Sequence, residues 1–137
     1  MKKTQIGWVV ITVILIIDAF VLYENLNTQT LFITLSLSLC LLLLFGSLTL
    51  SIDEYYLRFS FGVGLISKRY PLSKIESCRP ISYVPFGFGI RFRPGVILFN
   101  VSGYKALEIS IKGKYRKIWI GTNEPEAFAE YMQKQFE

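Results

Sequence analysis

The sequence predicts an α+β membrane protein, in which an N-terminal two-helix transmembrane hairpin precedes a small antiparallel β-barrel or sandwich with a C-terminal helix. Two apolar runs, residues 6–23 and 31–50, each approach the ~20 residues that cross ~30 Å of hydrocarbon. After residue 50 the apolar residues alternate with polar ones, as they do in half-buried strands. Near the end, Phe128, Met132 and Phe136 recur every four residues, which indicates the core face of a helix.

Composition divides the chain into two parts. Its 137 residues are 52% hydrophobic with a mean hydropathy of +0.42, which is too apolar for an ordinary soluble domain. The apolar excess lies in residues 1–50, which predicts a membrane hairpin there and one domain over residues 51–137. That domain holds thirteen Lys or Arg against eight Asp or Glu, so it carries essentially all of the net charge of +5.

The charge distribution also predicts sidedness. Lys2 and Lys3 precede the first run and the basic domain follows the second, whereas the connection over residues 24–30 has no Lys or Arg. Cytoplasmic segments carry an excess of Lys and Arg. We therefore expect a multi-pass protein of the inner cell membrane with both termini cytoplasmic. A secretory signal peptide is the alternative, but no small-residue cleavage site follows the first run.

Asp18 is the ionisable side chain inside a predicted span. If the hairpin is centred on Asn27, Asp18 faces Ser36, and Thr34, Ser36 and Ser38 offer hydroxyl donors. Such a bond stabilises helix pairs in a membrane by about 1 kcal/mol. The favoured interpretation is a structural bond between the helices. An ion or proton pathway and snorkelling to the interface remain as alternatives.

Several chemistries have no residues to support them. The sequence contains no histidine, which removes the usual general base and zinc ligand. Its two cysteines, Cys40 and Cys78, fall in different predicted parts, so no disulfide is expected and a reducing compartment fits. No P-loop, CxxC pair, EF-hand run or GxGxxG motif is present. We predict no enzyme, no catalytic residue, no metal site and no cofactor.

The alternation of apolar and polar residues predicts about seven short strands in the domain. Residues 55–61 and 65–70 predict a first hairpin, residues 88–93 and 96–101 a second across Pro94-Gly95, and residues 107–111 and 118–120 a third. In the second hairpin Phe88, Ile90 and Phe92 alternate with polar residues or glycine. Such strands closed by one helix are typical of a pleckstrin-homology-like barrel or sandwich, with an SH3-like barrel as the main alternative.

Three motifs carry a resemblance to a family. The segments GFGIRFRPG at 87–95, NVSGYKALEISI at 100–111 and KIWIGTNEP at 117–125 resemble those of small bacterial membrane proteins with a pleckstrin-homology-like domain after a two-helix hairpin. The resemblance covers nearly the whole chain and implies that fold, but it brings no catalytic or binding residue. The loop Gly62-Val63-Gly64 lacks the clustered cations of phosphoinositide-binding relatives, so specific inositol-phosphate binding is not expected.

The basic run over residues 112–117 is the most distinctive polar feature. It fits a solvated turn, or a lipid-headgroup site in which each cation near an anionic membrane gains about 1 kcal/mol. The predicted lipid-headgroup site consists of Lys112, Lys114, Arg116 and Lys117. Nucleic acid is not an expected partner, because no binding motif is visible.

We expect a non-enzymatic interaction or scaffold module that contacts the bilayer and binds a protein partner or its own copies at the inner membrane face. The first alternative is an anionic-lipid-binding accessory domain that uses the basic run. The second is a transporter or channel subunit built around Asp18.

Overall fold

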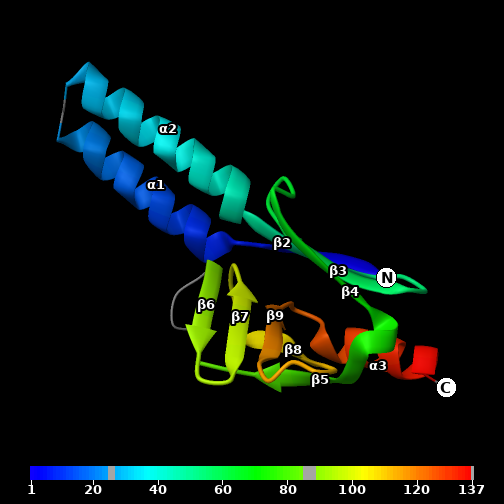
Figure 1. Cartoon of the computed structure of the whole chain (residues 1–137). Coiled ribbons are helices and arrows are strands. Elements are labelled where there is room, and N and C mark those ends of the chain that lie inside the picture. The colour runs from blue at the N-terminus through cyan, green and yellow to red at the C-terminus, as the bar shows by residue number, and fades with distance from the viewer. Residues whose placement is uncertain (25–26, 85–88, 137) are drawn as a thin grey trace.

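A computed structural model describes residues 1–24, 27–84 and 89–136. Within these ranges an apolar helical hairpin projects from two stacked β-sheets, and a third helix lies at their far end (Figure 1). The helices are α1 (Trp8–Tyr23), α2 (Thr28–Phe45), the short 3₁₀ helix η1 (Leu72–Lys74) and α3 (Pro125–Phe136).

The first sheet, sheet A, contains four antiparallel strands in the order β1-β2-β3-β4. These strands are β1 (Lys2–Ile6), β2 (Ser47–Ile52), β3 (Tyr56–Phe61) and β4 (Ile66–Pro71). The predicted hairpin of β3 and β4 is confirmed, and its turn uses Gly62 and Gly64, which both have positive φ.

The second sheet, sheet B, has five strands in the order β5-β8-β9-β7-β6. They are β5 (Ile75–Ser82), β6 (Gly89–Arg93), β7 (Val96–Asn100), β8 (Lys105–Ile111) and β9 (Lys117–Gly121). The predicted hairpins β6–β7 and β8–β9 are confirmed, but β7 and β9 run parallel, so sheet B is mixed. The α+β class with two N-terminal helices and a C-terminal helix is confirmed. Neither sheet closes on itself in the described parts of the chain, and a barrel is not confirmed.

The two N-terminal helices are an insertion between neighbouring strands of sheet A. β1 pairs with β2. Gly7 joins β1 to α1 and Gly46 joins α2 to β2, and the Gly7 amide donates to the Gly46 carbonyl at 2.8 Å. The predicted second span over residues 31–50 is therefore too long, since α2 ends at Phe45. Likewise, the expected domain boundary at residues 50 and 51 falls inside β2, and residues 2–6 belong to the same sheet.

The physical reason is an alternation within the apolar run. In β2 the side chains of Leu48, Leu50 and Ile52 are buried between the sheets, while the intervening Ser47, Thr49 and Ser51 lie on the outer face. Overall hydropathy does not distinguish this period of two from a continuous apolar helix.

Aromatic rings join the two sheets in the core. Phe59 of β3 lies 4.6 Å from Phe99 of β7 between ring centroids, and Phe61 lies 6.2 Å from the same ring. Helix α3 packs on β5 and β8 through Phe128 and Met132, as the four-residue stripe predicted. Phe136, the third member of that stripe, is 54% exposed, because it occupies the last turn of the helix.

Strand β6 departs from the expected alternation. Ile90 and Phe92 are exposed, Phe92 to 69%, and Phe88 lies outside the described residues. β6 is the outermost strand of sheet B, so among the described residues no strand pairs with its other side. Alternation distinguishes the two faces of a strand, but it does not say whether either face is covered.

Candidate functional site

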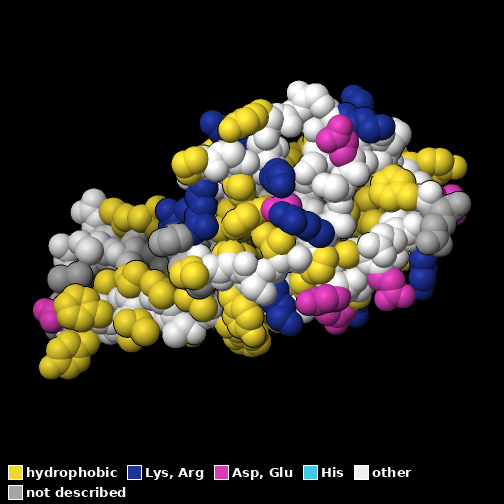
Figure 2. All heavy atoms as spheres, turned by 90° about the horizontal axis from the view of Figure 1, so that it is seen from below, with side chains coloured by type: hydrophobic (Ala, Val, Ile, Leu, Met, Phe, Trp, Pro, Cys, Tyr) yellow, Lys and Arg dark blue, Asp and Glu magenta, His cyan; other side chains and the backbone are white. Residues whose placement is uncertain are grey.

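The helical hairpin presents apolar side chains on nearly all sides. Ile14 and Ser38 are its buried residues, whereas Ile16, Phe20 and Phe32 are all more than half exposed. Figure 2 shows yellow hydrophobic side chains along the hairpin and most charged side chains over the sheets. Helix α2, with 18 residues, is long and apolar enough to cross a membrane, and α1 is an apolar helix of 16 residues. An apolar surface of this extent indicates a membrane or a large apolar partner.

A polar bond joins the two helices. The Ser38 hydroxyl donates to Asp18 Oδ1 at 2.6 Å, and Ser38 is one of the two buried residues of the hairpin. Ser36, the partner named from the sequence, is exposed. The pairing is thus centred on residue 28 rather than 27, which moves the facing position from Ser36 to Ser38. A hydroxyl of the predicted row does meet Asp18.

The β3–β4 turn is fixed against the end of α2. The Val63 amide donates to the Leu43 carbonyl at 3.0 Å, and a Cβ on Gly62 would lie 1.7 Å from that oxygen. Only glycine fits there. Val63 and Leu65, at the tip of this turn, are 63% and 78% exposed, so apolar side chains point outward beside the last turns of α2.

The outer face of sheet A carries two polar rows that run across its four strands. Cross-strand pairing aligns one row of hydroxyls, formed by Thr4, Thr49, Ser60 and Ser67. The second row lies further from α1 and α2, and it crosses β2 at Ser51, four residues after Ser47. It contains three cations, and its members are Lys2, Ser51, Arg58 and Arg69. A hollow of about 660 Å³ opens over this face and is lined by most of both rows.

The cations of this second row are held close together. Arg69 lies over the Tyr56 ring at 4.7 Å and Arg58 over the same ring at 5.6 Å, so one aromatic side chain supports two guanidinium groups. Arg58 also pairs with Asp53 at 3.4 Å. The Asp53 carboxylate accepts bonds from the amides of Tyr55 and Tyr56, which lower its pKa.

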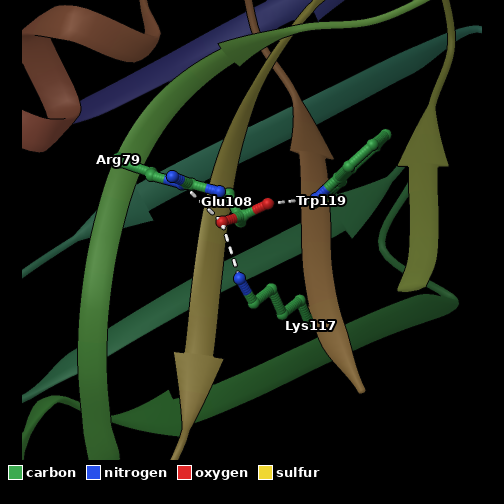
Figure 3. Close-up of polar contacts among 4 residues, drawn as sticks. All are labelled: Arg79, Glu108, Lys117 and Trp119. Carbon is green, nitrogen blue, oxygen red and sulfur yellow. Dashed lines mark hydrogen bonds and ion pairs between the residues drawn. The ribbon is translucent and has the colours of Figure 1, made fainter. Parts of the chain in front are cut away.

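The outer face of sheet B is organised around a buried carboxylate (Figure 3). Glu108 is 4% exposed and accepts bonds from Arg79 Nε at 2.6 Å and Trp119 Nε1 at 2.8 Å, with Lys117 Nζ at 3.5 Å. Burial by itself raises the pKa of Glu108, but these two hydrogen bonds and the charges of Arg79 and Lys117 together lower it. The Trp119 ring packs on Tyr83, with centroids 6.0 Å apart.

The basic run over residues 112–117 lies at the end of the sheets that is remote from α1 and α2. Lys112 bonds to the backbone of Lys74, and Lys114 Nζ lies 5.4 Å from the Tyr70 ring. Tyr70 pairs with Leu57, at the end of β3 remote from the Gly62 turn and therefore from α2. Lys112, Lys114 and Arg116 are exposed, and Lys117 is engaged with Glu108. This placement turns the four cations of the predicted lipid-headgroup site away from the hairpin.

The two cysteines lie apart, as expected from their positions in the two parts of the chain. Cys40 is exposed on α2 and Cys78 is half-buried on β5, where burial raises the pKa of its thiol to about 12. Among the described residues, no three His, Cys, Asp or Glu side chains gather into a group that could hold a metal ion.

Sequence reasoning missed the two polar rows of sheet A. The signal is visible in hindsight as Lys2 and Thr4 in one strand and Thr49 and Ser51 in another. Their alignment depends on a β1–β2 register that joins residues more than 40 positions apart, and the sequence does not supply that register. Comparison with protein-family models, with curated proteins and with solved structures finds no match for this chain.

Proposed function

We propose that this chain is a non-enzymatic membrane-anchored interaction module, which holds its two-sheet domain at the inner face of the cell membrane to bind a protein partner or a second copy of itself. The supporting observation is the insertion of an apolar hairpin between hydrogen-bonded strands of the domain. Because β1 and β2 continue directly into α1 and α2, the domain is attached to its anchor by two strands rather than by a flexible linker.

The geometry of the hairpin supports two crossings. Both helices begin or end at the Gly7–Gly46 bond, so the same short stretch of chain fixes one end of each. Helix α2 spans about 27 Å and α1 about 24 Å along their axes. If α2 enters the hydrocarbon, α1 enters to a similar depth, and both termini stay on the side of the domain. The Lys and Arg excess in that domain favours the cytoplasmic side.

The edge strand β6 is the surface best suited to a partner. Phe92 is 69% exposed and Ile90 lies beside an apolar hollow of about 510 Å³ at the base of the hairpin. Exposed aromatic side chains next to an open strand edge are suited to strand addition or to an apolar contact.

Topology and partnership are tested in cells that express the full chain. Single cysteines at Glu24 and at Lys112, in a Cys40→Ala, Cys78→Ala background, are labelled with a membrane-impermeant maleimide. We expect labelling at residue 24 from outside and at residue 112 only after lysis. Outside labelling at residue 112 contradicts the proposed side.

A photo-crosslinking residue at Phe92 then tests the partner surface. A discrete adduct is expected there, and the same residue at Tyr115, which is 90% exposed in the turn between β8 and β9, serves as the control. Absence of an adduct at residue 92, or an identical pattern at residue 115, contradicts β6 as the partner surface.

A further inference from the structure

We propose that the outer face of sheet A, together with the Gly62–Leu65 turn, binds the phosphate groups of anionic phospholipids in the leaflet that holds the hairpin. This inference rests on the membrane anchoring proposed above. It assigns the lipid contact to Lys2, Arg58 and Arg69, on a surface different from the basic run at residues 112–117.

Position follows from distances along the strands. The bond between Gly7 and Gly46 marks the base of the hairpin, and the hydroxyl row crosses β2 at Thr49, two residues after Ser47, the first residue of that strand. At ~3.3 Å per residue, this row lies about 7 Å from Ser47 and the cation row about 13 Å from it, as upper limits for tilted strands. The headgroup layer adds roughly 5 to 7 Å beyond the hydrocarbon, and charges act over about 8 to 10 Å at physiological salt. Both rows therefore lie within reach of the phosphates.

The turn between β3 and β4 reaches deeper than either row. Its Val63 amide bonds to Leu43, two residues inside the end of α2, or about 3 Å further along the helix axis. Val63 and Leu65 add two exposed apolar side chains to this turn. A turn that places two apolar side chains beside a membrane helix, with cations behind them, combines the two attractions that hold peripheral surfaces on bilayers.

The chemistry of the two rows suits a phosphate diester. Hydroxyls donate hydrogen bonds to phosphate oxygens, and guanidinium groups form paired bonds with them. The shared contact of Arg58 and Arg69 with Tyr56 holds these two groups over one ring. The hollow of about 660 Å³ above them leaves space for a headgroup.

Charge balance distinguishes this face from an ordinary mixed surface. Its row holds three cations, and Arg58 is paired with the exposed carboxylate of Asp53 at 3.4 Å. The face thus carries an excess of positive charge that an external anion can neutralise.

The test uses the full chain purified in a neutral detergent and titrated with phosphatidylglycerol or phosphatidylcholine, with bound lipid counted by native mass spectrometry. Two triple variants each remove three positive charges. The face variant is Lys2→Gln, Arg58→Gln, Arg69→Gln, and the matched control is Lys112→Gln, Lys114→Gln, Arg116→Gln. We expect the face variant to bind phosphatidylglycerol at least about tenfold more weakly than the parent, and the control to stay within about twofold.

Two further arms identify the source of the phosphate. The variant Val63→Ser, Leu65→Ser should weaken phosphatidylglycerol binding without changing any competition by inorganic phosphate. If inorganic phosphate occupies the face as tightly as the lipid does, the headgroup assignment is overturned. Equal losses in both triple variants, or no loss in the face variant, also overturn it.

A separate measurement keeps this failure distinct from failure of the anchor. Release of the full chain from cell membranes by alkaline carbonate contradicts the proposed anchoring itself. Retention in the membrane together with no preference for phosphatidylglycerol contradicts only the headgroup site.

Discussion

The outer faces of the two sheets both carry basic side chains, but these side chains differ in how they are paired with carboxylates. On sheet B, the cations Arg79 and Lys117 converge on Glu108, whose side chain is 5% exposed. On sheet A, Lys2, Arg58 and Arg69 surround an open hollow, and Arg58 is paired with Asp53, whose side chain is 49% exposed. Around Glu108 the opposite charges are paired with one another, whereas the row on sheet A holds more cations than carboxylates.

The difference follows from the cost of removing a charge from water. A buried carboxylate is tolerated when hydrogen bonds and opposite charges replace its hydration, and Glu108 has both from Arg79, Trp119 and Lys117. Exposed cations keep their hydration and need no internal partner. Basic residues on a strand can therefore belong to a structural network or to a surface that can bind an anion. The burial of the nearest carboxylate distinguishes these two cases.

The largest effect is expected from Glu108→Gln, which breaks the network on sheet B. It should lower the free energy of unfolding by about 2 kcal/mol, since hydrogen bonds to a charged group contribute roughly 1.5 to 3 kcal/mol and the partly exposed Arg79 can regain water. Denaturant titration of the full chain in detergent measures this change.

Asp53→Asn is the matched control on sheet A, because it makes the same chemical change in an exposed carboxylate. Asparagine can still accept the two backbone bonds of that turn, so the loss of stability should be clearly smaller than that of Glu108→Gln. Equal losses at the two positions contradict the distinction between the faces.

Acid should reduce the difference between the parent and Glu108→Gln. The pKa of Glu108 in the folded chain lies below its ordinary value of 4.5, because the hydrogen bonds and neighbouring charges outweigh burial. Its contribution to stability is therefore complete above pH 4.5 and is lost as the pH falls through the lower, folded-state pKa. Unfolding curves of both proteins from neutral pH to pH 3 should converge in acid. A gap that stays constant with pH would mean that the charge of Glu108 does not stabilise the fold.

Asp18 provides a second carboxylate to compare with Glu108, since Ser38 donates to it at 2.6 Å. Asp18→Leu should cost about 1 kcal/mol or less, and Asp18→Asn should cost almost nothing because the amide can still bond to the hydroxyl. A double-mutant cycle with Ser38→Ala measures the coupling in detergent or bicelles. Loss of a cellular phenotype in a folded, inserted Asp18→Asn protein would favour the ion-pathway alternative instead.

The sequence was informative where structure is decided locally. The hairpins β3–β4 and β8–β9 were predicted because alternation and turn glycines lie within a few residues of each other. Strand β1 and the end of α2 were missed because their pairing joins residues more than 40 positions apart. The same limit applied to the candidate sites. The basic run was visible as consecutive letters, whereas the row of Lys2, Arg58 and Arg69 exists only after three strands pair in register.

The smallest effect on stability is expected from the triple variant Lys2→Gln, Arg58→Gln, Arg69→Gln. Exposed ion pairs contribute little, and removal of neighbouring like charges offsets the loss of the Arg58–Asp53 pair, so the free energy of unfolding should change by less than about 0.5 kcal/mol. The same denaturant titration measures it beside Glu108→Gln. A near-zero change in stability combined with weaker phosphatidylglycerol binding would separate binding from folding on sheet A. A loss near 2 kcal/mol would instead mean that this row supports the fold as the Glu108 network does, and the contrast between the two faces would no longer hold.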